Sequence, residues 1–260
     1  MSRRSLIICL AVLGVMVIGV AVAVAALYSG VDNGTRDSGN GIPDQGRYLL
    51  LPAVPADAVA VCCFTEVQAA MGGLLRGFDF PAALTEGMAA GKFKSLSSSK
   101  MAVSLHYSGD VEALYVFDAG RSSSDVSDDA QSFMDFMRGR RMTVEFVDCS
   151  SSGSERDIVK RSVILASESD ALVKSAVRHL QKGISVMDAS GFSDAASSVT
   201  GSDVIFFSNS HAKMLMPAAF VKKYASNDSF VADFAQWTSV DLAKFDASGI
   251  HASVSAVFED

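Results

Sequence analysis

Histidine is the residue type best suited to acid–base chemistry near neutral pH, and the chain has four of them. They are His106, His179, His211 and His251, and no two stand at the short spacing that is typical of a metal site. A zinc site needs three or four converging ligands, whereas isolated histidines are usually solvated or hydrogen-bonded one by one. The sequence therefore predicts no metal site.

Serine is the other residue type that could act as a nucleophile here. It would need a base such as His106 or His251 within hydrogen-bonding distance. Three serine runs have the composition of loops: residues 97–99, 122–124 and 150–152. No G-x-S-x-G, H-E-x-x-H, G-x-G-x-x-G or G-x-x-x-x-G-K-[ST] motif occurs. We predict no catalytic, cofactor-binding or metal-ligating residue and no cofactor, and the alternative is an unrecognised Ser/His site.

The cysteines offer a disulfide rather than a catalytic group. Cys62 and Cys63 are adjacent in an apolar run, so in a strand they would face opposite sides and could not readily bond each other. Cys149 could pair with one of them if their strands were neighbours in an oxidising compartment. Buried free thiols are the commoner arrangement on core strands, and we expect it here. Cys9, in a long apolar segment, is best interpreted as a lipid-facing or packing thiol.

The charge of the chain excludes one class of partner. Net charge is -7, and the part after the first few residues is more negative still, because Arg3 and Arg4 come before it. A negative surface repels phosphate-rich partners, so we predict no binding to nucleic acid and no direct adhesion to anionic lipid. Arg138, Arg140 and Arg141 form a basic cluster that a helix C-terminus would favour, and docking of an acidic partner is the alternative.

An uncharged segment near the N-terminus has the length of a membrane span. Residues 5–31 contain no charged side chain, and residues 6–28 as a helix would reach about 34 Å, enough for a hydrocarbon core of about 30 Å. Arg3 and Arg4 precede it, so the positive-inside rule places the N-terminus in the cytoplasm. We predict a cytoplasmic tip and single transmembrane anchor in residues 1–28, with the domain outside the inner membrane.

A cleaved signal peptide is the alternative to an anchor. Residues 21–23 or 23–25 could serve as an A-x-A cleavage site, and the domain would then be secreted. The apolar run continues to Leu27 without the polar stretch that usually precedes cleavage, which favours the anchor. Residues 29–46 are rich in Gly, Asn, Asp and Ser and predict a flexible linker.

Short apolar runs in the remaining chain predict β-strands. Two pairs of runs are each joined by a short turn-forming loop, and they predict two hairpins. The loop of the first hairpin contains Gly109, and that of the second has the sequence SSSGS. The runs are residues 58–64, 101–107 with 112–118, 142–148 with 157–166, 203–209, and 249–258.

Two helices have a clear apolar stripe. The first begins after Ser127, which can cap it, and ends at Gly139. The second begins with Ser167 and Asp170 in a spacing like that of a capping box, and it ends at Gly183. Their inner faces carry Ala130, Phe133, Met134 and Met137 in the first and Val173, Val177 and Leu180 in the second. Further helices are predicted at residues 66–76, 192–199, 211–224 and 230–237.

Hairpins that alternate with single helices predict an α+β fold, with a largely antiparallel sheet and helices packed on one face. Residues 57–64 resemble residues 203–210, and YVFD at 115–118 resembles AVFED at 256–260, which suggests two related modules. We expect the first α+β module in residues 47–200 and the start of a second in residues 201–260. The second repeats only part of the first, so we expect it to be incomplete; a natural terminus after a paired strand is the alternative.

Several segments resemble a family of uncharacterised single-span bacterial envelope proteins, known only as a domain of unknown function. They are LLPAVPADAVAVCCF at 50–64, ILASESDALVKSAVRHLQKG at 164–183 and FVADFAQWTSVDL at 230–242. The resemblance implies a place in the envelope and assigns no functional residue. We expect a membrane-anchored binding or structural module with an envelope protein as partner, and the alternative is an exported hydrolase with an unrecognised Ser/His site.

Overall fold

The computed structural model describes residues 49–72, 84–88, 90–97, 99–121, 126–152, 158–199, 203–212, 236–246 and 249–257. The predicted anchor (1–28) and the predicted linker (29–46) lie outside these residues. Among the helices that the structure does describe, none has the length and apolar character that crossing a bilayer requires.

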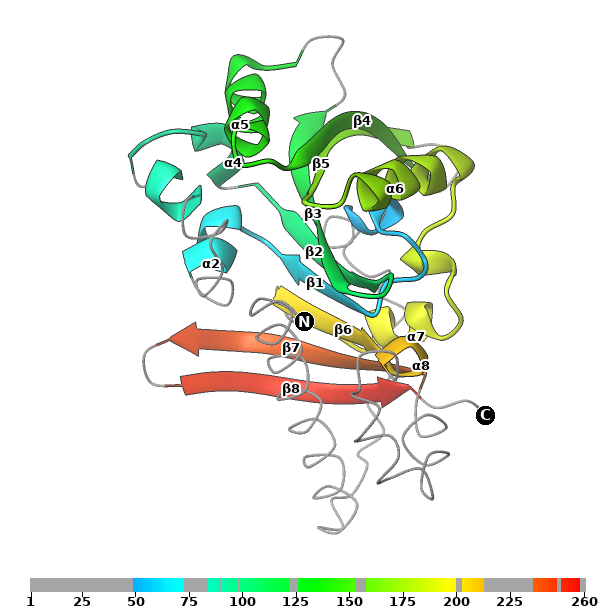
Figure 1. The fold of residues 1–260 in the computed structure, drawn as a ribbon. Helices are drawn as coiled ribbons and strands as arrows, with labels where there is room; N and C mark the ends of the chain where they lie inside the picture. The colour runs from blue at the N-terminus through cyan, green and yellow to red at the C-terminus, as the bar shows by residue number, and fades with distance from the viewer. Residues whose placement is uncertain are drawn as a thin grey trace.

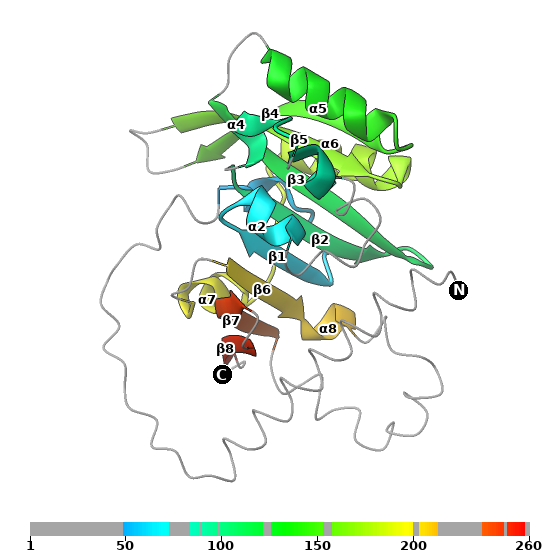
Figure 2. The same ribbon diagram turned by 90° about the vertical axis from the view of Figure 1, so that its left-hand side faces the viewer.

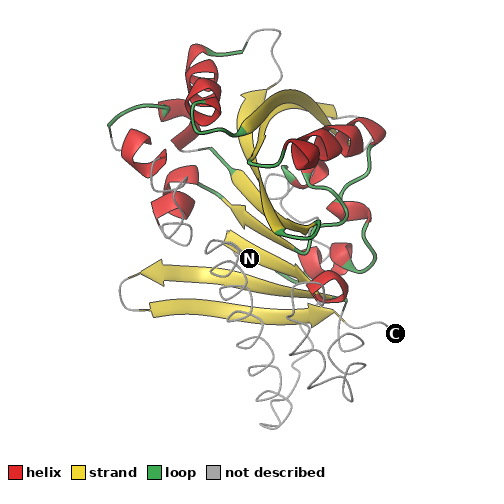
Figure 3. Ribbon diagram, viewed as in Figure 1, coloured by secondary structure: helices red, strands yellow, loops and turns green. Residues whose placement is uncertain are grey.

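The centre of the fold is one antiparallel sheet of eight strands, in the order β4-β5-β3-β2-β1-β6-β7-β8 (Figures 1 and 3). Every neighbouring pair runs antiparallel. The sequence-based prediction of a largely antiparallel α+β fold is therefore confirmed. The strands are β1 (Ala60–Phe64), β2 (Met101–Tyr107), β3 (Val111–Arg121), β4 (Thr143–Ser152), β5 (Ile158–Ser167), β6 (Asp203–Ser208), β7 (Trp237–Asp246) and β8 (Gly249–Val257).

Helices cover both faces of the sheet, so the prediction that they pack on one face is wrong (Figures 1 and 2). One face, here called the α5 face, is covered by α2 (Val67–Gly72), α4 (Lys94–Ser97) and α5 (Asp128–Arg138). The opposite face, here called the α6 face, is covered by η1 (Leu51–Ala53), α6 (Asp170–Lys182), η2 (Val186–Asp188) and α7 (Phe192–Ser197). Each strand near the centre therefore buries alternate residues in two separate cores.

The packing of α5 and α6 follows their apolar stripes. Phe133 and Met137 are fully buried on the α5 face, and Val173 is fully buried on the α6 face. Val177 and Leu180 are partly buried and pack against the same α6-face core. The predicted helix phases are confirmed. A stripe of this kind fixes which side of a helix is buried, but it does not say which face of the sheet the helix covers.

Three of the four predicted end residues of these helices are confirmed. Ser127 accepts a hydrogen bond from the Ala130 amide at 3.2 Å, and Gly139 follows the last helical residue of α5. Gly183 ends α6 in the left-handed conformation at φ 66°. The predicted cap Ser167 is instead the last residue of β5. Ser169 caps α6, and its hydroxyl accepts a hydrogen bond from the Leu172 amide. The spacing could not separate these serines, because both precede Asp170 closely.

Both predicted hairpins are present, as β2–β3 and β4–β5, with strands up to a few residues longer than expected. Gly109 turns the first of them at φ 104°, a value that glycine adopts without strain. The predicted strands at 58–64, 203–209 and 249–258 appear as β1, β6 and β8. The predicted helix at 192–199 appears as α7.

The region after β6 differs from the prediction. Only α8 (Asn209–Ala212) is described where a helix at 211–224 was expected, and the rest of that range lies outside the described residues. The expected helix at 230–237 is wrong at its end, because Trp237 opens β7. The indole packs edge-on against Phe192 of α7, with ring centroids 4.9 Å apart, and its Nε1 donates to the Ser190 carbonyl. These contacts bury the indole between β7 and α7, and its N–H still has a hydrogen-bond acceptor.

The strand order has an approximate two-fold arrangement about the β1–β6 pair. On one side the order continues β1-β2-β3, and on the other it continues β6-β7-β8. The weak sequence echo between residues 57–64 and 203–210 therefore corresponds to two strands that are neighbours at the centre of the sheet. Beyond β3 the sheet continues with β5 and β4, whereas β8 is the last of the described strands on its side.

Candidate functional site

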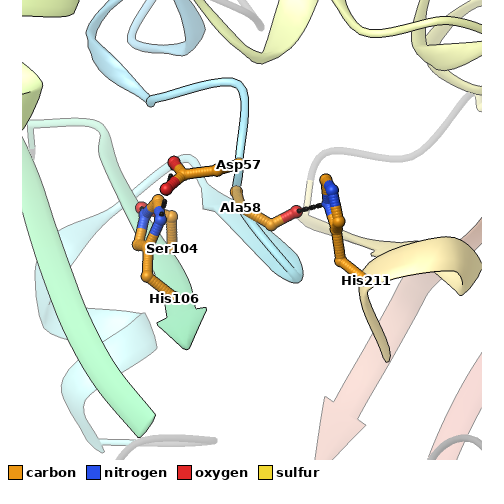
Figure 4. A network of polar contacts seen from close by, with 5 residues as sticks. All are labelled: Asp57, Ala58, Ser104, His106 and His211. Carbon is orange, nitrogen blue, oxygen red and sulfur yellow. Dashed lines mark hydrogen bonds and ion pairs between the residues drawn. The ribbon is translucent and has the colours of Figure 1, made fainter. Parts of the chain in front are cut away.

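The best candidate for a chemical site lies where β1 begins and β2 ends (Figure 4). Ser104 and His106 are alternate residues of β2, so they share one face of the sheet, the α6 face. His106 Nε2 lies 2.9 Å from Ser104 Oγ, and His106 Nδ1 lies 3.2 Å from Asp57 Oδ1. Asp57 belongs to the turn that leads into β1. Serine, histidine and aspartate are thus joined in the order found in serine hydrolases.

The hydrogen bonds give each member of this group a donor or acceptor role. An ionised carboxylate only accepts, so Nδ1 of His106 donates to Asp57, and Nε2 of the neutral ring accepts from the hydroxyl of Ser104. The hydrogen bond from His106 lowers the pKa of Asp57, against the opposing effect of partial burial. When His106 is protonated its positive charge acts in the same direction, and so, more weakly, does that of a protonated His179. Asp57 is therefore the charged end of the network.

The exposure of these three side chains does not suit a serine nucleophile. Ser104 is fully buried, and the side chain of His106 is only 4% exposed, whereas that of Asp57 is 67% exposed. In a serine hydrolase the serine faces the substrate and the carboxylate is buried behind the histidine. Here the serine lies inside the sheet and the carboxylate faces solvent. The group has the connectivity of a triad, but its hydroxyl is closed off from any substrate.

Two other histidines lie near the same turn. His211 of α8 contacts the carbonyl of Ala58 through Nδ1, at 3.3 Å. Figure 4 shows it on the far side of the turn from His106. His179 of α6 has a buried Nδ1 with no hydrogen-bond partner in the described structure. Among the residues that the structure describes, no three His, Cys, Asp or Glu side chains gather as a metal ion would require.

His251, the other base considered from the sequence, is far from this group. It lies in β8, opposite Lys244 of β7. Four strand spacings separate β8 from β2, which is about 19 Å. Sequence reasoning therefore named one of the three members of the network, His106, and missed Asp57 and Ser104. The spacing Ser-x-His within a predicted strand was the available signal, because it places both side chains on one face.

The cysteines are free thiols in the described structure, as expected. Cys62 packs in the α5-face core and Cys63 in the α6-face core, so adjacent residues do point to opposite faces. Cys149 lies on β4, and β5, β3 and β2 separate it from β1. A disulfide from Cys149 to either residue of β1 is excluded by that distance. Burial raises the pKa of Cys62 to about 12 and also raises that of Cys63 and Cys149, so none is an activated thiol.

The basic cluster at the end of α5 is engaged locally. Arg138 forms an ion pair with Asp135 at 3.1 Å, one turn back along the helix. The guanidinium of Arg140 lies 3.8 Å from the centroid of the Phe136 ring. These contacts agree with the helix-terminus interpretation and leave docking of an acidic partner without a structural indication.

No protein-family model, no curated protein and no solved structure matches this chain. The class of protein is therefore defined by its own structure. It is an α+β domain built on one eight-stranded antiparallel sheet with helices on both faces.

Proposed function

We propose that this chain is a membrane-anchored, extracytoplasmic binding or structural module of the bacterial cell envelope that carries out no catalysis itself. The observation that carries the non-catalytic part is the burial of Ser104. The Ser104–His106–Asp57 group has the order of a catalytic triad, but its hydroxyl lies inside the sheet and bonds His106, which in turn holds the turn before β1 through Asp57. A buried, fully hydrogen-bonded polar group of this kind specifies packing.

The anchor and the location rest on the sequence. An uncharged run of spanning length follows Arg3 and Arg4, and a polar linker separates it from the folded domain. The resemblance to single-span envelope proteins supports the same location. In this proposal the N-terminal helix holds the chain in the inner membrane, and the domain meets an envelope protein outside it.

Two exposed apolar side chains mark a segment where contact with a partner protein can be tested. Ile184 and Met187 are 43% and 47% exposed, and they flank the buried Val186 just after α6. These two exposed apolar side chains are three positions apart in the chain, so they make this segment a candidate contact site. A photo-crosslinking residue at each position, in the full chain expressed in intact cells, tests whether this region contacts an envelope protein.

Glu145 is the control position, because it is an exposed, charged residue of β4, outside the segment that follows α6. The proposal expects one envelope protein to be captured from positions 184 and 187 and not from position 145. Capture of cytoplasmic proteins alone, or equal capture from all three positions, would contradict it.

The second candidate is an exported hydrolase. The specific observation in its favour is that Ser104, His106 and Asp57 are hydrogen-bonded in catalytic order. This candidate requires β2 to move so that Ser104 becomes accessible. Covalent labelling of Ser104 by a serine-reactive probe would establish such an opening.

A further inference from the structure

The side of α6 that faces away from the sheet carries a row of cations. Lys174, Arg178 and Lys182 are exposed and stand four residues apart, so they follow one stripe of the helix over about 12 Å. The chain as a whole has a net charge of -7. Within α6, Asp170 is the one carboxylate against these three cations. The charge of this helix is therefore opposite to that of the chain.

Two cations of the row have no charged partner within the described fold. Lys174 pairs with Asp170 at 2.7 Å. Arg178 and Lys182 form no ion pair with any residue that the structure describes. The arginines at the end of α5, in contrast, have the local partners given above. Exposed cations alone are common on helices, but the cations of α6 adjoin a second exposed feature.

The segment that follows α6 holds two apolar side chains in solvent. Ile184 and Met187 are 43% and 47% exposed. Their backbone is fixed, because the Ile184 amide donates to the His179 carbonyl at 3.0 Å and the Val186 amide donates to the Val54 carbonyl at 2.8 Å. Val186 is fully buried between them. A rigid segment that presents apolar side chains has little conformational freedom to lose when a partner binds.

The cations and the apolar side chains form one surface at the C-terminal end of α6. It consists of Arg178, Lys182, Ile184 and Met187, and we call it the α6-end surface. One glycine at the helix end separates Lys182 from Ile184. The carboxylate of the following residue, Asp188, accepts from the Ser185 amide at 2.7 Å and so serves the local turn.

Charge complementarity favours a protein segment as the occupant of this surface. Positive patches bind best to negative ones, and exposed apolar side chains bind to apolar ones. An anionic bilayer and a nucleic acid are extended, so either would also meet other parts of a chain whose net charge is -7. A peptide segment is narrow enough to contact the row of cations alone.

We propose that the α6-end surface docks a segment of the envelope partner that contains both acidic and apolar side chains. This inference rests on the function proposed above, because it names the chemistry of the partner at the contact site given there. Arg178 and Lys182 pair with the acidic side chains, and Ile184 and Met187 pack against the apolar ones.

Charge reversal combined with photo-crosslinking tests the proposal in intact cells. The crosslinking residue stands at position 187 of the full chain, which is compared unchanged, as Arg178→Glu/Lys182→Glu and as Arg138→Glu/Arg140→Glu. The last is the matched control, because it makes the same change of charge at the same end of α5. We expect the yield of the envelope-protein adduct to fall at least about tenfold in the α6 variant and less than about twofold in the control.

Two defined probes test the chemistry with purified full chain in nanodiscs of phosphatidylcholine. The first is a labelled peptide of Glu and Leu, and its counterpart has Lys in place of Glu. Fluorescence anisotropy should show binding of the acidic peptide alone, weakened at least about tenfold by Arg178→Glu/Lys182→Glu but not by Arg138→Glu/Arg140→Glu. The second probe is vesicles of phosphatidylglycerol, and we expect the α6 variant to bind them as the unchanged chain does.

Three results would overturn the proposal. Equal adduct yields from the unchanged chain and the folded α6 variant would contradict it and leave the proposed contact site intact. Vesicle binding that the α6 variant loses, without binding of the acidic peptide, would assign the surface to anionic lipid. Capture of no envelope protein by the unchanged chain would contradict the proposed contact site and this proposal with it. If circular dichroism shows that the α6 variant is unfolded, Arg178→Gln/Lys182→Gln and Arg138→Gln/Arg140→Gln replace the reversed pairs, with the same outcomes.

Discussion

Asp57 and His106 lie 49 residues apart in the chain, and their facing atoms Oδ1 and Nδ1 are 3.2 Å apart. This contact ties the exposed turn before β1 to the buried end of β2. Through Ser104 it continues into the sheet, so one chain of hydrogen bonds runs from solvent to core. The hydrogen bonds follow the order of a serine hydrolase, but the burial is reversed, and the consequences for stability can be measured.

Replacing His106 should cost more stability than replacing either of its partners. His106→Ala leaves a cavity and deprives the buried Ser104 hydroxyl of its acceptor, so we expect a loss of about 2–4 kcal/mol in the free energy of unfolding. Ser104→Ala should cost about 1–2 kcal/mol, because only His106 Nε2 loses a partner. Denaturant unfolding of the full chain in detergent measures both.

The double variant supplies the control for this comparison. Once His106 is gone, Ser104→Ala removes a hydroxyl that has already lost its partner, so the two effects should fall short of adding. Strictly additive losses would show that the two side chains do not depend on each other, against the network described here.

The charge of Asp57 should stabilise the protein only above the acidic range. The pKa of this carboxyl is lower in the folded than in the unfolded state, chiefly because His106 donates to it. Its contribution is therefore present above the unfolded pKa of about 4 and is lost as pH falls through the folded value. Asp57→Asn keeps the acceptor and removes the charge. Since the side chain is mostly exposed, the difference at pH 7 should be under about 1 kcal/mol.

Unfolding curves at pH 7 and at pH 3 test this prediction. The stability difference between the wild-type chain and Asp57→Asn should be smaller at pH 3 than at pH 7. A difference that grows towards pH 3 would have the opposite sign and would contradict the assignment of Asp57 as the charged end.

The α5-face core should depend strongly on one ring. Phe133 is fully buried, and its ring packs edge-on against Phe93 and Phe117, with centroid distances of 5.3 and 4.9 Å. Phe133→Ala should therefore cost about 3–5 kcal/mol. Gln131→Ala, on the exposed side of the same helix, should change stability by less than about 0.5 kcal/mol. Similar losses from both would mean that α5 does not pack as described.

Local patterns in the sequence were enough to predict most of the described helices and strands. The hairpins, the apolar stripes of α5 and α6, and the glycine that ends α6 all follow from interactions within a few residues. The strand β7 was missed because Ser239 and Asp241 are buried on its α6 face, where an apolar alternation would have marked a strand. A periodic pattern predicts burial only when the buried residues are apolar.

Long-range relationships could not be predicted. The pairing of β1 with β6 joins segments about 140 residues apart, and neither strand specifies its partner by composition. The stripe of α5 and that of α6 are alike, yet the helices lie on opposite faces. Asp57 could not be linked to His106 for the same reason, since only the sheet brings the turn before β1 beside β2.

The proposed anchor should still be present in the mature chain. The apolar run in residues 6–28 has spanning length and lacks a polar stretch before the cleavage-like sites, so the mature protein should retain it. Intact-mass measurement of the protein extracted from membranes tests this directly. A mature N-terminus at Val24, Ala26 or Leu27 would show that the segment is a cleaved signal peptide.

We propose that the Ser104–His106–Asp57 group is a closed structural network and that it does not serve as a hydrolase site. The most direct measurement is labelling of the native full chain with a fluorophosphonate probe, followed by mass spectrometry of the labelled peptides. Because Ser104 is fully buried, we predict no modification at this residue, and the same result for wild type and His106→Ala while each is folded. Stoichiometric labelling of Ser104 in the wild type, lost in His106→Ala, would contradict the account and establish a hydrolase.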